Sequence, residues 1–411
     1  MSRLLIAGGR VVDPAAGMDA LADVRICDGR VTEVAPNLRR HDGEEIFDAA
    51  GSVVAPGFVD MHVHLREPGF PQKETIATGT EAAVRGGFTS LACMPNTRPA
   101  LDDPATLGRL AEEIGRSARC RVYPIGAITR DRAGETPCDY RALARAGAVA
   151  FSDDGDTIAN AAVLRQAALD AAGVPGVFIS HCEDAALKAA ACGDGLAEDV
   201  VVARDLLIAT ETGKAWHVAH ATTELALDLV RWARAHGARV TCEVTPHHLS
   251  FEGELARSWG SAAAVNPPLR GERDIAALRR GVADGTVDAL ATDHAPHTDA
   301  EKHAEPAAPG FTGLEIALGA YAAALPDLPL LRFVALLSTN PARILGIAAG
   351  TLAPGAAADV TIFAQRDWVV DPATFASKGR CTPFAGRTLP RKVLATIVGG
   401  AVRYRDAQAP G

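Results

Sequence analysis

Two histidines and an arginine occupy alternate positions in the stretch M-H-V-H-L-R-E-P-G, residues 61–69. Side chains two residues apart on a β-strand point to the same face, so His62, His64 and Arg66 would project together from an extended chain. Two neutral imidazoles on one face can bind one divalent ion, and zinc suits them well. An H-x-H pair alone is a weak signal, so a metal site would need more ligands from elsewhere in the chain.

Further ligand-type residues stand at the ends of other apolar runs: His181 in S-H-C-E-D, His220 in H-V-A-H and Asp293 in A-T-D-H-A-P-H. Another run ends in F-S-D-D-G and offers two adjacent carboxylates. Asp154 shares a strand face with the small residues of its run, so we expect it to point inward. Its neighbour Asp153 would then cap a turn or support a ligand.

The absence of lysine from one part of the chain limits which group could bridge two metal ions. No lysine occurs between Lys73 and Lys188. A two-zinc site bridged by a carboxylated lysine at the end of the fourth run is therefore excluded, and a carboxylate would have to bridge two ions.

The ligand-type residues need elements that bring them together, and the middle of the chain supplies a repeating pattern. Short apolar runs alternate with amphipathic stretches of helical length, which is typical of a parallel α/β fold. Eight units in about 250 residues predict a (β/α)8 TIM-type barrel, whose active site lies at the C-terminal ends of the strands. The eight runs cover residues 58–64, 88–96, 121–129, 148–155, 177–184, 216–223, 239–248 and 287–294.

Nearly every run turns polar at its C-terminal end, which is where a barrel would need its active-site residues. In the first run, simple alternation places Phe58 and Asp60 on the face of the histidines. The same alternation predicts that Val59, Met61, Val63 and Leu65 pack against helices.

Both ends of the chain read as short β segments separated by turns. We expect residues 1–56 and 346–411 to form one small β-sandwich domain, and residues 57–345 to form the catalytic barrel.

Composition excludes several classes of protein. The chain has 411 residues, 48% of them hydrophobic, and a formal charge of −9, which argues against a nucleic-acid-binding face. The apolar run at the start is too short for a secretory core or a membrane span, so we expect a cytoplasmic protein with no membrane partner. The eight cysteines are scattered without any C-x-x-C pair, which favours reduced thiols.

Taken together, the motifs of the chain resemble those of one known family. G-F-V-D-M-H-V-H-L-R-E-P-G, C-M-P-N-T, F-S-D-D-G, H-C-E-D, H-V-A-H, E-V-T-P-H-H, V-N-P-P-L-R and A-T-D-H-A-P-H occur in this order. The chain therefore resembles the bacterial type I dihydroorotases of the amidohydrolase superfamily, over nearly its whole length.

The resemblance implies reversible hydrolysis of L-dihydroorotate to N-carbamoyl-L-aspartate in pyrimidine synthesis, with one or two zinc ions per subunit. By resemblance, His62, His64, Asp154 and Asp293 would hold one ion. Asp154, His181 and His220 would hold the other. Asp293 would also act as the catalytic acid and base.

The same resemblance implies contacts to the substrate. Arg66 would clamp its carboxylate, His64, Asn96 and His297 would assist, and Asn266 would bind the amide edge of the ring. The loop 298–311 is either a solvated linker or a lid. It lacks the Pro-Phe-Gly run that is usual in the family.

Two alternatives remain open at this stage. Another cyclic amidase, an allantoinase or hydantoinase, is disfavoured by the missing lysine. A non-catalytic dihydroorotase-like subunit of aspartate transcarbamoylase would be expected to have lost metal ligands. We also expect a homodimer, with aspartate transcarbamoylase as a candidate partner.

Overall fold

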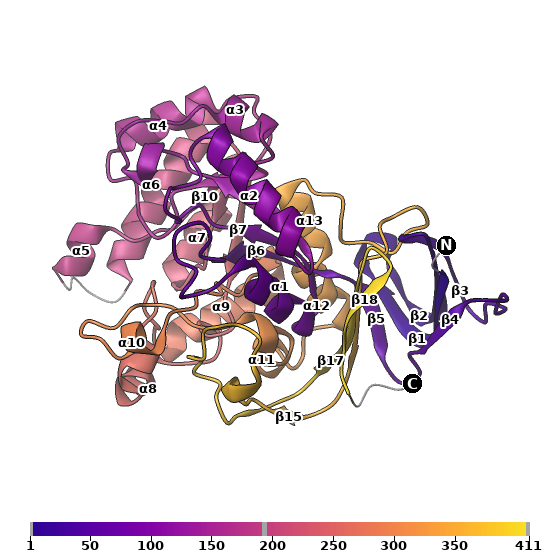
Figure 1. The fold of residues 1–411 in the computed structure, drawn as a ribbon. Helices are drawn as coiled ribbons and strands as arrows, with labels where there is room; N and C mark the ends of the chain where they lie inside the picture. Colours follow the sequence, from indigo (N-terminus) through magenta and orange to yellow (C-terminus); the bar gives the residue numbers. More distant parts are fainter. Residues whose placement is uncertain (1–2, 191–194, 408–411) are drawn as a thin grey trace.

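The computed structural model describes residues 3–190 and 195–407, and Figure 1 shows a helix-covered barrel with a β-rich part at its side. The barrel sheet has eight strands, hydrogen-bonded in chain order and all parallel. They are β6 (Phe58–Val63), β7 (Phe88–Cys93), β8 (Arg121–Gly126), β9 (Ala150–Ser152), β10 (Phe178–Ser180), β11 (Trp216–Val218), β12 (Val240–Val244) and β13 (Ala289–Leu290). A parallel bridge between Val63 and His294 brings the first and last strands together.

Helices connect the strands and cover the outside of the barrel (Figure 1). Several begin where the sequence offers a capping side chain: Thr75 caps the first, and Asp103 caps the second just before a proline at its first position. The helices are α1 (Ile76–Arg85), α2 (Pro104–Ser117), α3 (Tyr140–Arg145), α4 (Ala161–Asp170), α5 (Ala185–Ala189), α6 (Leu196–Thr212), α7 (Glu224–Ala235), α8 (Gly253–Ser258), α9 (Glu272–Asp284), α10 (Asp299–Lys302), α11 (Ala317–Ala324), α12 (Leu330–Leu337) and α13 (Thr339–Leu345). The α/β barrel expected from the eight apolar runs is confirmed.

The apolar filling of the barrel differs from the expectation for β6. Val59 and Met61 were expected to face helices, but they lie in a buried cluster with residues of most other barrel strands and with Leu345 of α13. Phe58 lies instead in the large cluster that includes helix residues. The pairing of β6 with β7 shifts register on both sides of Val59–Asp60, and strict alternation fails where a strand is irregular.

Strands from both ends of the chain form a second sheet, at the right in Figure 1. Its order is β18-β17-β14-β5-β1-β2-β3, with β4 also paired to β1. The strands are β1 (Arg3–Asp13), β2 (Met18–Cys27), β3 (Arg30–Ala35), β4 (Glu45–Asp48), β5 (Val53–Pro56), β14 (Val360–Ala364), β17 (Lys392–Val398) and β18 (Ala401–Arg405). Strands β15 (Trp368–Val369) and β16 (Thr388–Leu389) form a separate pair.

The second sheet folds around a core of its own. β1 pairs with β4 along its first half and with β5 further on, which bends the sheet over a buried cluster including Ile6, Phe47 and Val360. This confirms the expected β-sandwich from both termini. The exact domain boundaries, 1–56 with 346–411 and 57–345, stay a prediction.

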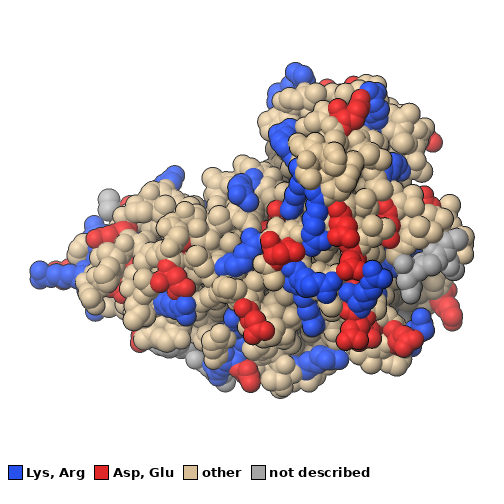
Figure 2. All heavy atoms as spheres, turned by 180° about the vertical axis from the view of Figure 1, so that it is seen from behind, with Lys and Arg blue, Asp and Glu red and all other residues tan. Residues whose placement is uncertain are grey.

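The seven described cysteines are free thiols, whereas Cys192 lies outside the described residues. Among the helices of residues 3–190 and 195–407, none combines the length and apolarity needed to cross a membrane. Basic and acidic side chains are intermingled on the face shown in Figure 2.

Candidate metal centre and active site

The ligand-type residues expected at the strand ends all come from one end of the barrel. His62 lies in β6 and His64 just beyond it, and the others follow the C-terminal ends of their strands. All six predicted metal ligands are buried. Two of them, His220 and Asp293, have positive backbone φ angles of 32° and 47°. Residues other than glycine adopt such angles at a cost of about 1–3 kcal/mol. Such strain is typical of functional sites.

One group of ligand atoms lies around Asp293. Its Oδ1 is 3.2 Å from His64 Nε2 and 3.5 Å from His62 Nε2. These three side chains each offer one atom to a common point.

A second group lies around Asp154. Its Oδ1 is 3.3 Å from His62 Nε2, 3.8 Å from His181 Nδ1 and 3.9 Å from His220 Nε2, while its Oδ2 is 3.5 Å from His64 Nε2. The rings of His181 and His220 meet edge to face at 83°, with His181 Nδ1 and His220 Nε2 2.9 Å apart. Asp154 thus stands between the two groups, as a bridging carboxylate would.

The spacing of these atoms fits a metal better than it fits hydrogen bonds. His62 Nε2 and Asp154 Oδ1 are buried and make no hydrogen bond within the described structure. Most of the nitrogen–oxygen separations exceed a normal hydrogen bond. Two ligands bound tetrahedrally at about 2.0–2.1 Å lie roughly 3.3 Å apart, close to the observed values. Imidazole and carboxylate ligands together suit zinc or another divalent transition metal.

The far nitrogens of three imidazoles are held by acceptors. His62 Nδ1 donates to Glu243 Oε1 at 2.7 Å, and His64 Nδ1 donates to Asn96 Oδ1 at 2.9 Å. His181 Nε2 lies 3.5 Å from Glu183 Oε2. Acceptors behind metal-binding histidines fix the ring orientation and the tautomer.

Sequence reasoning assigned no role to Glu243 or Glu183. The signal for Glu243 was the one acidic residue in the barrel run 239–248, since a carboxylate is almost never fully buried unless it is paired. Glu183 directly follows Cys182 in the H-C-E-D motif, but nothing in its spacing distinguishes it from a surface residue.

Asp153 and Asp154 are neighbours with different surroundings. Asp153 accepts hydrogen bonds from the backbone of Ile128 at 2.8 Å and of Thr129 at 3.0 Å. It therefore ties the loop after β8 to the end of β9. Its position agrees with the cap expected of it, and Asp154 occupies the position between the imidazoles.

Electrostatics keep the central carboxylates charged. Burial opposes ionisation of Asp293, but His62 and His64 outweigh it and hold the pKa of Asp293 well below its usual value. The pKa of Asp154 is low for the same reason. Burial, reinforced by two neighbouring histidines, lowers the pKa of His220 to about 3, so this imidazole is neutral and has a lone pair for a metal.

Arg66 and His297 lie together beside the metal ligands. Arg66 Nε donates to the carbonyl of Pro296 at 3.1 Å, and its Nη2 is 3.1 Å from His297 Nε2. Burial lowers the pKa of Arg66 to about 10, which leaves it cationic at neutral pH. Burial, with Arg66 and Lys73 nearby, lowers the pKa of His297 to about 3, so its ring is neutral. This pair can present a cation and a polar ring to an anionic ligand.

The loop 298–311 is anchored by a buried lysine. Lys302, at the end of α10, donates to the carbonyls of Ala264 (3.2 Å), Ala308 (2.9 Å) and Gly310 (3.0 Å). His297 Nε2 also lies 2.9 Å from the carbonyl of Pro309. The loop is thus packed rather than a free linker. Asn266 is half-buried in the neighbouring segment that Lys302 holds.

Fold and site together define a (β/α)8 barrel with a candidate binuclear metal centre at the C-terminal ends of its strands. A dihydro-orotase-like family model matches residues 51–225. The chain is 49% identical to a dihydroorotase of Pelotomaculum thermopropionicum, over 98% of this chain and 99% of the relative. It is 42% identical to a dihydroorotase of Syntrophus aciditrophicus, over 98% and 100% of the two chains.

The chain therefore belongs to the dihydroorotase family. Among solved structures, an L-hydantoinase (dihydropyrimidinase) from Arthrobacter aurescens has a TM-score of 0.89 at 24% identity, covering 100% of this chain and 98% of that one. This likeness supports the fold alone.

Proposed function

We propose that this protein is a dihydroorotase of the bacterial type I class, which interconverts L-dihydroorotate and N-carbamoyl-L-aspartate in pyrimidine synthesis. The observation that carries the proposal is the cluster of imidazole and carboxylate atoms around Asp154, with Arg66 beside it. Close relatives named dihydroorotase support the choice of substrate.

We propose zinc as the metal. His62, His64, Asp154 and Asp293 would hold one ion, and a second would lie between Asp154, His181 and His220. A bound divalent ion would polarise the ring carbonyl and lower the pKa of a water molecule.

The residues of the chain supply the proton transfers. Asp293 accepts a proton from the attacking water as the oxygen bonds to the ring carbonyl carbon. The bond from that carbon to the ring nitrogen then breaks, and Asp293 returns the proton to the nitrogen. Ring closure uses the same steps in reverse. The low pKa of Asp293 keeps its carboxylate ionised at neutral pH, so its oxygens can act as acceptors.

Substrate orientation rests on the groups that surround the ligands. The Arg66 guanidinium pairs with the substrate carboxylate, and the neutral His297 ring donates or accepts one further hydrogen bond. Asn96 and His64 are already hydrogen-bonded to each other, so their orientation is fixed before the substrate binds. Asn266 would bind the amide edge of the ring.

Zinc content and substrate selectivity test the proposal together. We expect the purified protein to contain one or two zinc ions per chain and to turn over dihydroorotate far faster than hydantoin or allantoin. Preference for hydantoin or allantoin would contradict the proposal and favour another cyclic amidase. Absence of both metal and turnover would favour a non-catalytic subunit.

Self-association is part of the proposal. Leu196, Val200 and Leu207 of α6 are 44%, 44% and 56% exposed and recur at helical spacing on one face. This apolar stripe supports an interface, and we propose a homodimer that also binds aspartate transcarbamoylase. Sedimentation of the protein, alone and with the transcarbamoylase, would measure both. A monomer that does not bind the transcarbamoylase would contradict this part of the proposal.

A further inference from the structure

Glu243 is a fully buried carboxylate inside the barrel, one residue before the C-terminal end of β12. Its Oε1 accepts a hydrogen bond from His62 Nδ1 at 2.7 Å, and its Oε2 lies 3.2 Å from His217 Nε2. Within the described part of the chain, these two imidazoles are its ion-pair partners, and neither lysine nor arginine pairs with it.

The chemistry of a carboxylate decides the protonation of both rings. An ionised carboxylate only accepts hydrogen bonds, so each ring nitrogen facing Glu243 must carry a hydrogen. A metal ligand must be a neutral imidazole, and in the neutral His62 ring the hydrogen then lies on Nδ1 and the lone pair on Nε2. Nε2 is the atom that faces Asp154 and Asp293, at 3.3 Å and 3.5 Å.

His217 is held from its other side. Its Nδ1 lies 2.7 Å from the hydroxyl of Thr241, which can donate to it. A neutral His217 can therefore carry a hydrogen on Nε2, which contacts Glu243 Oε2 at 3.2 Å although neither atom makes a hydrogen bond in the described structure. Contacts between neighbouring side chains thus run from Thr241 through His217 and Glu243 to His62. The last of these side chains, His62, presents its lone pair to the metal site.

The three acceptors behind the ligand histidines differ in charge. Asn96 behind His64 is neutral. Glu183 behind His181 shares its charge with Lys188, whose ammonium donates to it at 2.5 Å. Glu243 has only imidazole partners, so the positive charge best placed to balance it is a cation bound by His62. Coulomb interaction across one imidazole is strong in a buried site.

We propose that Glu243 is a positioning residue for the metal centre. It fixes His62 in the tautomer that presents Nε2 to the ion, and its unshared negative charge strengthens metal binding. His217 in turn contacts the second oxygen of Glu243 and limits where this carboxylate can lie. The inference rests on the proposed function only in requiring a divalent metal at this site, and it does not depend on which cyclic amide is hydrolysed.

Metal affinity of matched variants tests the inference. Glu243→Gln keeps the size and one acceptor oxygen but removes the charge, and Glu183→Gln makes the same change behind His181. Zinc affinity is measured by competition with a chromophoric chelator, starting from the metal-free protein and without substrate. We expect Glu243→Gln to weaken zinc binding about 10- to 100-fold, which is typical for the loss of such a partner. Glu183→Gln should weaken it less.

A merely structural role would lower the melting temperature of the metal-free protein without changing zinc affinity. Wild-type affinity in Glu243→Gln, or an equal loss in Glu183→Gln, would overturn the inference.

Two variants of His217 provide a test that leaves Glu243 intact. The amide of His217→Gln can still donate to Glu243, whereas His217→Leu cannot. We expect zinc affinity to fall in the order wild type, His217→Gln, His217→Leu, and equal affinity in all three would overturn the inference. A changed zinc affinity with no turnover of dihydroorotate would refute the proposed function and leave this inference standing.

Discussion

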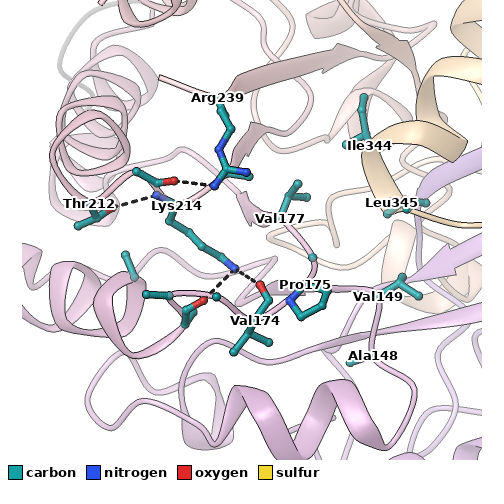
Figure 3. Close-up of a pocket in the computed structure, with 18 residues that line it drawn as sticks. Ala148, Val149, Val174, Pro175, Val177, Thr212, Lys214, Arg239, Ile344 and Leu345 are labelled. Carbon is teal, nitrogen blue, oxygen red and sulfur yellow. Dashed lines mark hydrogen bonds between the residues drawn. The ribbon is translucent and has the colours of Figure 1, made fainter. Parts of the chain in front are cut away.

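The two ends of the barrel differ in a way that locates the chemistry. At the N-terminal ends of strands β9 to β12 lies a cavity of about 670 Å³, lined by Val149, Val177, Lys214, Arg239 and Leu345 among others (Figure 3). The metal ligands lie at the opposite end, where the strands finish. Both ends contain buried charged groups, so neither burial nor charge alone distinguishes them.

The difference is whether the polar atoms are satisfied. At the N-terminal end, Lys214 donates to the carbonyls of Ala171 and Val174 at 3.3 Å and 3.1 Å, and Arg239 donates to the carbonyl of Gly213 at 2.8 Å (Figure 3). No carboxylate occurs among the described residues that line this cavity. At the other end, the buried ligand atoms His62 Nε2 and Asp154 Oδ1 lack hydrogen bonds and face each other at 3.3 Å. A large cavity thus says less about chemistry than a small set of unsatisfied atoms.

The largest expected effect comes from the proposed acid and base. Asp293→Asn should lower kcat about 100- to 10,000-fold, because the amide cannot carry the proton between water and the leaving nitrogen. Steady-state hydrolysis of dihydroorotate measures this. Lys214→Met, at the other end of the barrel, is the control and should change kcat less than twofold. Comparable losses in both variants would contradict the contrast between the two ends.

Neighbouring carboxylates offer a sharper comparison within the active end. Asp154→Asn should release at least one zinc ion, whereas Asp153→Asn should retain zinc and keep the acceptor for the backbone of Ile128 and Thr129. It should lower the free energy of unfolding by about 1–3 kcal/mol, because its amide nitrogen cannot accept the hydrogen bond from the Thr129 hydroxyl. Elemental analysis and denaturant unfolding would measure the two effects. Zinc loss in Asp153→Asn alone would reverse the roles assigned to this pair.

Arg66 should affect binding more than chemistry. Arg66→Met should raise KM for dihydroorotate about 10- to 100-fold, which corresponds to the loss of a hydrogen-bonded ion pair of roughly 1.5–3 kcal/mol. The KM of Arg66→Lys should lie between those of Arg66→Met and the wild type, since a lysine retains the charge but cannot form two parallel hydrogen bonds to a carboxylate. An unchanged KM in Arg66→Met would remove Arg66 from the binding site.

The smallest effect on activity is expected for Lys214→Met. This variant should instead change how the free energy of unfolding depends on pH. Burial lowers the pKa of Lys214 from 10.5 to about 8. As pH falls from 10.5 to 8, the unfolded chain binds a proton that the folded chain does not, so the wild type loses roughly 3 kcal/mol of stability. Lys214→Met should lack this loss. The free energy of unfolding of both proteins should be measured between pH 8 and 10.5. An equal loss of stability in the variant and the wild type would contradict the prediction.

The strands and the position of Asp154 could be predicted from the sequence because both depend on local pattern, whereas the role of the strand-end residues as metal ligands stays a prediction. Eight apolar runs became eight barrel strands, and Asp154 rather than Asp153 lies between the imidazoles. The inward position of Met61 could not be predicted, because it results from a register shift between β6 and its neighbour. The anchoring of the loop 298–311 by Lys302 could not be predicted, because its acceptors are backbone carbonyls, which no residue type in the sequence identifies.

The second sheet sets the time at which the chain can finish folding. Val54 of β5 pairs with Ile362 of β14, and Phe58 at the start of the barrel donates its backbone hydrogen to Thr361, 303 residues later. During synthesis at about 5–20 residues per second, the N-terminal strands must wait on the order of 15–60 seconds for these partners. Until then the apolar face around Ile6 and Val54 is open, and a chaperone that covers it would protect the nascent chain from aggregation.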